Sequence, residues 1–138
     1  MSIIDERKNL LREEFEIFDN PQDKFEYIIS KSKNTPGLDA SLKTEANLVQ
    51  GCVSNLWLAV SFENGVCDFK SDADSIITKG IANLVCGMYG RLTPQEILDF
   101  DCAILEEVGI SQYLSPNRRN GLSQLCGRIS DFARALSV

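Results

Sequence analysis

The stretch that decides the fold, residues 56–71, has the sequence LWLAVSFENGVCDFKS. Apolar side chains alternate along its first half, and this period of two is typical of a β-strand with one buried face. The dipeptide Asn64-Gly65 that follows is the strongest short signal for a two-residue hairpin turn. Such a turn fixes the register of an antiparallel ribbon and places four apolar side chains on one face. The facing pairs are Val60 with Phe69, and Phe62 with Cys67.

Helical patterns lie on both sides of this hairpin. Before it, apolar residues recur at helical spacing over residues 6–18 and again after Pro21, where Asn20 can cap the second helix. Residues 34–44 carry turn-forming residues and predict a loop. Residues 45–50 could add a third strand to the hairpin.

After the hairpin, the pattern predicts helices to the end of the chain. Residues 71–90 begin with acidic side chains, which we expect in the first turn of a helix because they favour its dipole. Shorter helices are expected from the capping box at Thr93 and over residues 101–108, and a long one from Ser115. The order of elements indicates one α+β domain over residues 1–138, a small antiparallel sheet packed against several α-helices.

Composition and charge exclude some classes of function. The formal net charge is −6, and the chain has a single arginine pair, Arg118-Arg119, whereas nucleic-acid binding normally needs a basic stripe. The charged N-terminal stretch fits neither a signal peptide nor a transit peptide, and no apolar run is long enough to span a membrane. We therefore expect a cytoplasmic protein that binds neither nucleic acid nor a membrane.

Five cysteines and no histidine limit the chemistry further. An odd number of cysteines in a reducing compartment favours free thiols, and their spacing of 15 residues or more disfavours a metal site. Cys67, Cys86 and Cys126 fall on apolar faces and are predicted to fill the core. Cys102 is also expected to fill the core, and its acidic neighbours would raise the pKa of its thiol and slow its reactions.

Cys52 differs from the other four cysteines in its setting. It follows Gly51, where the backbone can turn without a Cβ penalty, and it precedes polar Ser54, which indicates a loop that leads into a strand. Strand parity also places position 52 with Leu56, so the side chain could instead face the core. From the residues alone, a reactive and a structural thiol both stay open. Because the chain has no histidine to act as base, sulfur relay suits a reactive Cys52 better than hydrolysis does.

Four blocks of the sequence together carry a family resemblance. They are QGCVSNLWLAV at 50–60, SDADSIITKGIANLV at 71–85, LTPQEILDFD at 92–101 and LSPNRRNGL at 114–122. In order and spacing the blocks resemble the SufE family of cysteine desulfuration proteins. The most specific part is the motif GC-x-S-x-(L/V)-W, which begins at Gly51. The resemblance implies a SufE/IscU-like α+β fold.

The resemblance also implies a function. Family members accept sulfur from a SufS-type cysteine desulfurase that depends on pyridoxal phosphate. Cys52, which matches the family's cysteine, would carry the sulfur as a persulfide and deliver it to a downstream scaffold complex that builds iron-sulfur clusters. The pyridoxal phosphate belongs to the partner, so no cofactor and no metal is expected on this chain, which would act with the desulfurase rather than as a stand-alone enzyme.

Gly51, Asp74 and Arg118 match family positions expected at the surface that docks on the partner. For Asp74 the simpler alternative is a carboxylate in the first turn of a helix, favoured by the helix dipole. For Arg118 the alternatives are a solvated side chain and a cation that favours the thiolate of Cys52.

Three other interpretations stay open. A CsdE-type acceptor would have the same chemistry but serve a different desulfurase, CsdA. An iron-sulfur or metal scaffold would use Cys52 as a ligand, although the chain lacks the several cysteines and other ligands of such scaffolds. In a non-catalytic adaptor, Cys52 would be only structural. The sequence also leaves the oligomeric state open, a homodimer included.

Overall fold

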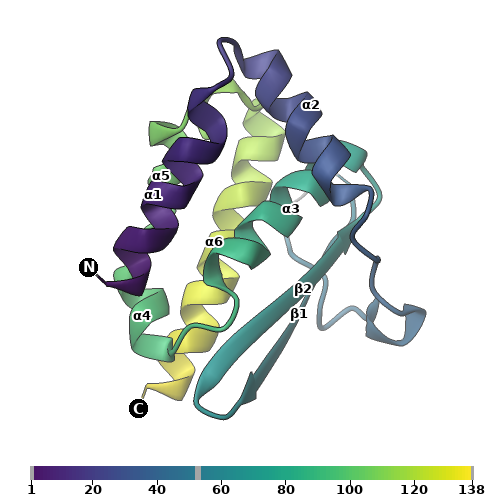
Figure 1. Cartoon of the computed structure of the whole chain (residues 1–138). Coiled ribbons are helices and arrows are strands. Elements are labelled where there is room, and N and C mark those ends of the chain that lie inside the picture. Colours follow the sequence, from purple (N-terminus) through teal and green to yellow (C-terminus); the bar gives the residue numbers. More distant parts are fainter. Residues whose placement is uncertain (1, 52–53, 138) are drawn as a thin grey trace.

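The α-helices lie on one side of a short antiparallel sheet, so the chain has an α+β fold (Figure 1). The computed structural model describes residues 2–51 and 54–137. Within this part, the helices before the sheet are α1 (Ile3–Glu16), α2 (Pro21–Ser32) and the short 3-10 helix η1 (Ala40–Leu42). The helices after it are α3 (Ile76–Tyr89), α4 (Pro94–Asp99), α5 (Ile104–Glu107), η2 (Ser111–Tyr113) and α6 (Pro116–Leu136).

The sheet is the predicted hairpin. It consists of β1 (Leu56–Glu63) and β2 (Val66–Ala73), in the predicted register. The turn residues between the strands have positive φ angles, 54° at Asn64 and 81° at Gly65, as a two-residue hairpin turn requires. The confirmed pairs are Val60 with Phe69, and Phe62 with Cys67.

Only half of the predicted apolar face is covered. Cys67 and Phe69 are buried in β2, and the ring of Phe69 meets Phe132 of α6 edge to face, with 6.1 Å between the centroids. In contrast, Val60 and Phe62 of β1 are 39% and 44% exposed. The reason is that α3 packs on β2, and β1 forms the edge farther from the helices.

The helix starts follow their capping residues. Ser115 caps α6 and Asn20 caps α2, as predicted, and Thr93 forms the full capping box with Glu96 at the start of α4. The first helix starts earlier than predicted, at Ile3, because Ser2 accepts a hydrogen bond from the third residue of the helix.

The expected acidic first turn of the third helix is wrong. β2 continues to Ala73, so Asp72 lies in the strand, and Ser75 caps α3, which begins at Ile76. Asp74 therefore precedes the cap instead of lying in the first turn.

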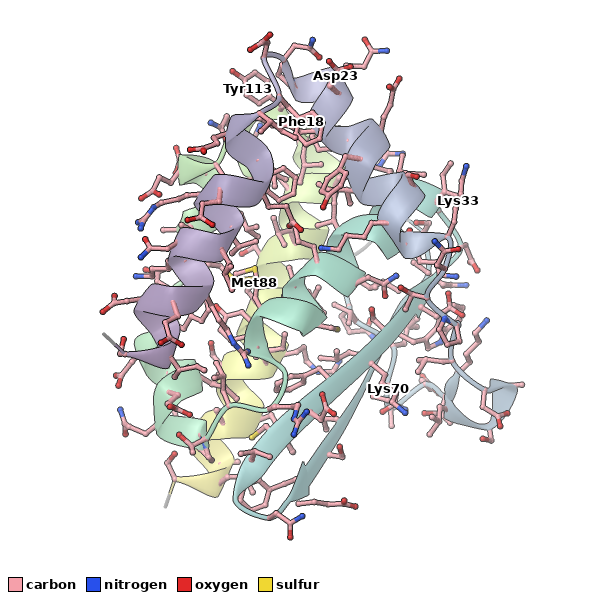
Figure 2. All side chains as sticks on the ribbon, viewed as in Figure 1. Phe18, Asp23, Lys33, Lys70, Met88 and Tyr113 are labelled. Carbon is pink, nitrogen blue, oxygen red and sulfur yellow. A yellow bond between two sulfur atoms is a disulfide. The ribbon has the colours of Figure 1, made fainter. Side chains whose placement is uncertain are left out.

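The core lies where α3 and α6 meet the hairpin and the N-terminal helices. Met88 of α3 is 3% exposed and lies between α3 and α1 (Figure 2). Arg7 of α1 donates hydrogen bonds to the carbonyl oxygens of Met88 and Gly90, over 2.6 and 2.7 Å, which ties α1 to the C-terminal end of α3. The most deeply buried large side chains include Phe15, Leu56, Leu58, Leu92, Ile97, Leu105, Ile110, Leu125 and Ile129.

Candidate functional site

The segment that carries Cys52 is closed at its base by backbone pairing. The amide of Val49 donates to the carbonyl of Leu56 over 2.7 Å, and the amide of Leu58 donates to the carbonyl of Asn47 over 2.8 Å. The third strand considered for residues 45–50 is thus reduced to an isolated bridge beside β1. We call residues 50–55, between these paired positions, the Cys52 loop. Cys52 itself lies outside the described residues.

Gly51 has the special backbone conformation that the sequence suggests. Its φ angle is +86°, a region that side chains with a Cβ rarely adopt. A Cβ at this position would also lie 3.1 Å from Nδ2 of Asn120 and 3.3 Å from Cγ of Gln124, both on α6. Gly51 therefore provides both a turn and a close approach of the Cys52 loop to α6.

Arg118 shares a hollow with Ser54, which lies two positions after Cys52. The hollow has a volume of about 250 Å³. It contains the caps of two long helices, Ser75 of α3 and Ser115 of α6, so the positive ends of both helix dipoles lie beside it. The complete lining is Ser54, Ser75, Thr78, Ser115, Asn117, Arg118 and Gly121.

The Arg118 side chain is exposed at this hollow. Its backbone amide donates to the hydroxyl of Ser115 over 3.3 Å, which is the capping bond of α6. Among the described residues, no hydrogen bond or ion pair engages its guanidinium group. The side chain also borders an apolar recess beside Leu56 and Leu122. The geometry thus places a cation without a described partner near the end of the Cys52 loop.

Asp74 meets the Cys52 loop through its backbone. Its amide donates to the carbonyl of Asn55 over 3.1 Å, while its side chain is exposed. The three described residues that the sequence predicted for the site therefore all contact or flank this loop. Gly51 lies in it, Asp74 bonds to its end, and Arg118 borders the hollow with Ser54.

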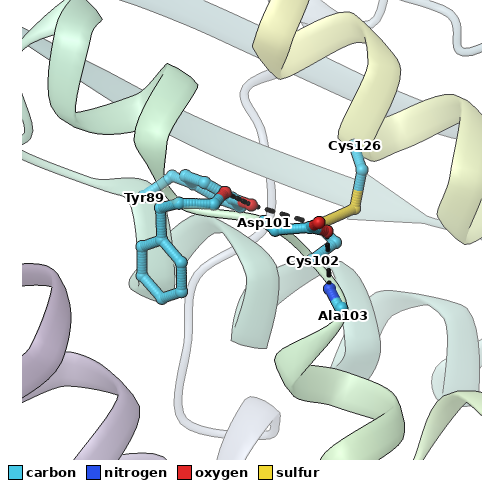
Figure 3. The surroundings of a disulfide bond; sticks show 6 residues. Tyr89, Asp101, Cys102, Ala103 and Cys126 are labelled. Carbon is cyan, nitrogen blue, oxygen red and sulfur yellow. Dashed lines mark hydrogen bonds between the residues drawn. A yellow bond between two sulfur atoms is a disulfide. The ribbon is translucent and has the colours of Figure 1, made fainter.

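The expectation of free thiols throughout is wrong for two cysteines. Cys102 and Cys126 form a disulfide, with 6.7 Å between their Cα atoms (Figure 3). Both side chains are half-buried and pack against the core. The hydroxyl of Tyr89 lies 3.2 Å from Sγ of Cys102. A sequence separation of 24 residues does not predict a disulfide. The two cysteines meet only because α6 packs beside the segment between α4 and α5.

The remaining two described cysteines are buried and unreactive. Cys67 is 0% exposed and Cys86 is 8% exposed, as predicted for core residues. Burial raises the pKa of the Cys67 thiol, and it raises the pKa of Cys86 to about 11. A raised pKa lowers the thiolate fraction at neutral pH, which disfavours nucleophilic chemistry at both thiols.

Two residues of α6 that sequence reasoning missed also bind the chain around Gly51. Asn120 donates to the carbonyl of Gly51, and Arg128 donates to the carbonyls of Leu48 and Ala46. Side chains that bind backbone carbonyls leave no pattern in the sequence of the segment that they hold, so only the structure reveals them.

A larger groove of about 740 Å³ lies between α1, α2 and α3. Leu11, Phe15, Ile28 and Met88 contribute apolar side chains to it. None of the described residues that the sequence predicted for the site lines this groove. It is therefore separate from the candidate site.

The described residues contain no cluster of three or more histidine, cysteine, aspartate or glutamate side chains that could hold a metal ion. None of the described helices combines the length and apolar character of a membrane span.

Comparison with known proteins identifies a family and a fold. Residues 9–133 match the family model named SufE, described as an Fe-S metabolism associated domain. The structure is also similar to the solution structure of a hypothetical protein from Thermus thermophilus, with a TM-score of 0.75. That match covers 96% of this chain and 97% of the other at 16% sequence identity, so it concerns the fold alone.

Proposed function

Because the chain belongs to the SufE family, whose domain is associated with iron-sulfur metabolism, we propose that it accepts sulfur from a SufS-type cysteine desulfurase. Cys52 carries the sulfur as a persulfide. It then delivers it to a scaffold complex that assembles iron-sulfur clusters. The protein contributes a thiol and a docking surface, and the partner contributes the pyridoxal phosphate.

The transfer is a thiol exchange without net oxidation. The thiolate of Cys52 attacks the outer sulfur of the persulfide on the partner's cysteine, and the sulfur-sulfur bond of that persulfide breaks. The partner's cysteine leaves as a thiolate, and Cys52 gains one sulfur atom. At delivery the roles change, because an acceptor thiolate then attacks the outer sulfur on Cys52.

The proposal rests on the positively charged groups that surround the Cys52 loop. Arg118 and the N-terminal ends of α3 and α6 border the hollow that contains Ser54. Cationic groups and helix N-termini favour an anion over its neutral form, and a thiolate is the reacting form of cysteine. The four described cysteines are either buried or in the disulfide, which leaves Cys52 as the thiol suited to exchange.

The test is the intact mass of the protein after incubation with a SufS-type desulfurase and cysteine, without reductant. We expect the wild type to gain the mass of about one sulfur atom, and the gain to disappear on adding reductant. Cys52→Ser should gain none. A parallel incubation with a CsdA-type desulfurase shows which partner the chain serves. Equal sulfur on wild type and Cys52→Ser, or none on either although docking is confirmed, would refute the proposal.

A further inference from the structure

Three hydrogen bonds from α6 hold the chain immediately before Cys52. Nδ2 of Asn120 donates to the carbonyl of Gly51 over 2.8 Å. The guanidinium of Arg128 donates from Nη1 to the carbonyl of Leu48 and from Nη2 to that of Ala46, both over 3.0 Å. We call these two side chains and their three carbonyl partners the α6 clamp.

The α6 clamp adds to the backbone pairing at the base of the Cys52 loop. The bond from Val49 to Leu56 fixes where the loop starts and ends, and Val49 is only 2% exposed. Within the loop, Gly51 lies close to α6, with Asn120 and Gln124 beside it. The two donors of the clamp are eight residues apart on α6, which corresponds to about 12 Å along the helix axis. The segment from Ala46 to Gly51 is thus fastened at two separate points.

We infer that Asn120 and Arg128 are positioning residues that orient the Cys52 loop for sulfur uptake. This inference rests on the proposed function, and neither residue belongs to the catalytic chemistry itself. Both bind backbone carbonyls, so they act on the path of the chain and not on the sulfur. Arg128 donates both bonds from one planar, charged group, which makes its contact the stronger and more directional of the two.

Loss of the clamp should affect two reactions of the same thiol differently. Transfer from a partner's buried persulfide requires one orientation of the loop, whereas a small alkylating reagent does not. Loss of one hydrogen bond shifts the balance between the held and released loop by about two- to tenfold. Release should therefore slow sulfur uptake by up to that factor without slowing alkylation.

The test compares Asn120→Leu and Arg128→Gln with the control Arg134→Gln. Arg134 lies on the same helix and bonds only to Asp131 among the described side chains, so its substitution removes the same charge without touching the clamp. The first measurement is hydrogen exchange of the Val49 and Asp74 amides, which flank the Cys52 loop. We expect about two- to tenfold faster exchange in Asn120→Leu, at least as large an increase in Arg128→Gln, which loses two bonds, and wild-type exchange in the control. Unchanged exchange in the clamp variants would overturn the inference.

The second measurement separates positioning from electrostatics and from general damage. In Asn120→Leu, the plateau rate and the pH midpoint of Cys52 alkylation should both stay at their wild-type values, while the initial rate of sulfur uptake should fall. Arg128→Lys keeps the charge but not the planar fork, so its rate of sulfur uptake should lie between those of the wild type and Arg128→Gln. Faster exchange with unchanged sulfur uptake would overturn the positioning role. If the wild type itself accepts no sulfur, the proposed function fails, while hydrogen exchange still decides whether the clamp holds the loop.

Discussion

The backbone amide of Asp74 donates a hydrogen bond to the carbonyl oxygen of Asn55, over 3.1 Å. This bond joins the end of the Cys52 loop to the residue that precedes the cap of α3. It uses the backbone alone, and the Asp74 side chain is exposed. Asp74 can therefore hold the loop through its amide while its carboxylate faces outward. A substitution that removes only the charge should thus leave the fold intact and test docking alone.

Asp74→Asn should weaken docking on the desulfurase without loss of stability. An exposed carboxylate at the rim of an interface acts mainly through charge, so we expect a roughly two- to tenfold rise in Kd that shrinks at high salt. The free energy of unfolding should change by less than about 0.5 kcal/mol. Calorimetric titration at two salt concentrations and urea unfolding measure both effects. Asp131→Asn, which removes an exposed carboxylate on α6, serves as the control. Equal affinity of Asp74→Asn and wild type would contradict a docking role.

Arg118→Ala should move the alkylation profile of Cys52 to higher pH. A nearby cation favours the thiolate and so lowers the pKa of a thiol, which means that its removal raises that pKa. We expect the midpoint of rate against pH to rise by up to about one unit, and Arg118→Lys to keep most of the wild-type midpoint. Arg119→Ala is the neighbouring control, because the Arg119 guanidinium is engaged by carbonyls of residues 111, 112 and 114. A profile that Arg118→Ala leaves unchanged would remove the electrostatic role.

Asp72 ties the long loop before the hairpin to β2. It is only 7% exposed, accepts a hydrogen bond from the amide of Leu38 over 3.1 Å, and pairs with Lys43 at 3.2 Å and Lys79 at 3.8 Å. Burial alone would raise the pKa of this carboxyl group. Hydrogen bonds from Lys43 and from the amides of Ala73 and Leu38 outweigh it, so the pKa of Asp72 lies below its ordinary value.

Asp72→Asn should therefore destabilise the protein in a pH-dependent way. At neutral pH we expect a loss of about 1–3 kcal/mol, because the donors around the carboxylate lose their charged partner. A lowered pKa in the folded state gives stability that is complete above the unfolded value of about 3.9 and is lost as the pH falls through the folded value. Urea unfolding at neutral pH and at several acidic pH values should show that the free energies of unfolding of the wild type and Asp72→Asn converge as the pH falls. If the difference in free energy of unfolding between the two proteins is the same at every pH, the charge of the Asp72 carboxylate does not contribute to stability.

The hairpin and the helix starts were predictable because their causes are local. A period of two with Asn64-Gly65 sets the register, and Ser115 or Thr93 before proline sets a helix start. The start of α3 was placed wrongly because pairing with residues 56–58 of β1 carries β2 on to Ala73, past residues that also suit a helix. The clamp from Arg128 and the disulfide of Cys126 were out of reach, because both depend on which segment packs against α6.

The disulfide between Cys102 and Cys126 should be detectable by counting thiols. In denaturant without reductant, three of the five cysteines should react with a thiol reagent, and all five should react after reduction. Closing a loop over 24 residues is expected to stabilise the fold by about 3 kcal/mol. The double variant Cys102→Ser/Cys126→Ser should lose that amount of unfolding free energy. Adding reductant should then leave the unfolding free energy of this variant unchanged. Five reactive thiols before reduction would restore the expectation of free cysteines.

Gly51 and Gly65 allow a matched comparison of strain and function. Both have left-handed φ angles, +86° and +81°, but a Cβ at Gly65 would meet nothing within 4 Å, whereas one at Gly51 would press on Asn120 and Gln124. Alanine at either position should cost about 1–2 kcal/mol of stability from the backbone alone. Only Gly51→Ala should also displace the Cys52 loop from α6 and slow sulfur uptake from the desulfurase. Urea unfolding and the initial rate of mass gain, measured on both variants, check this. Because the two variants carry a similar strain, a similar slowing of uptake in both would show that lost stability is the cause, and that contact between Gly51 and α6 has no part in the transfer.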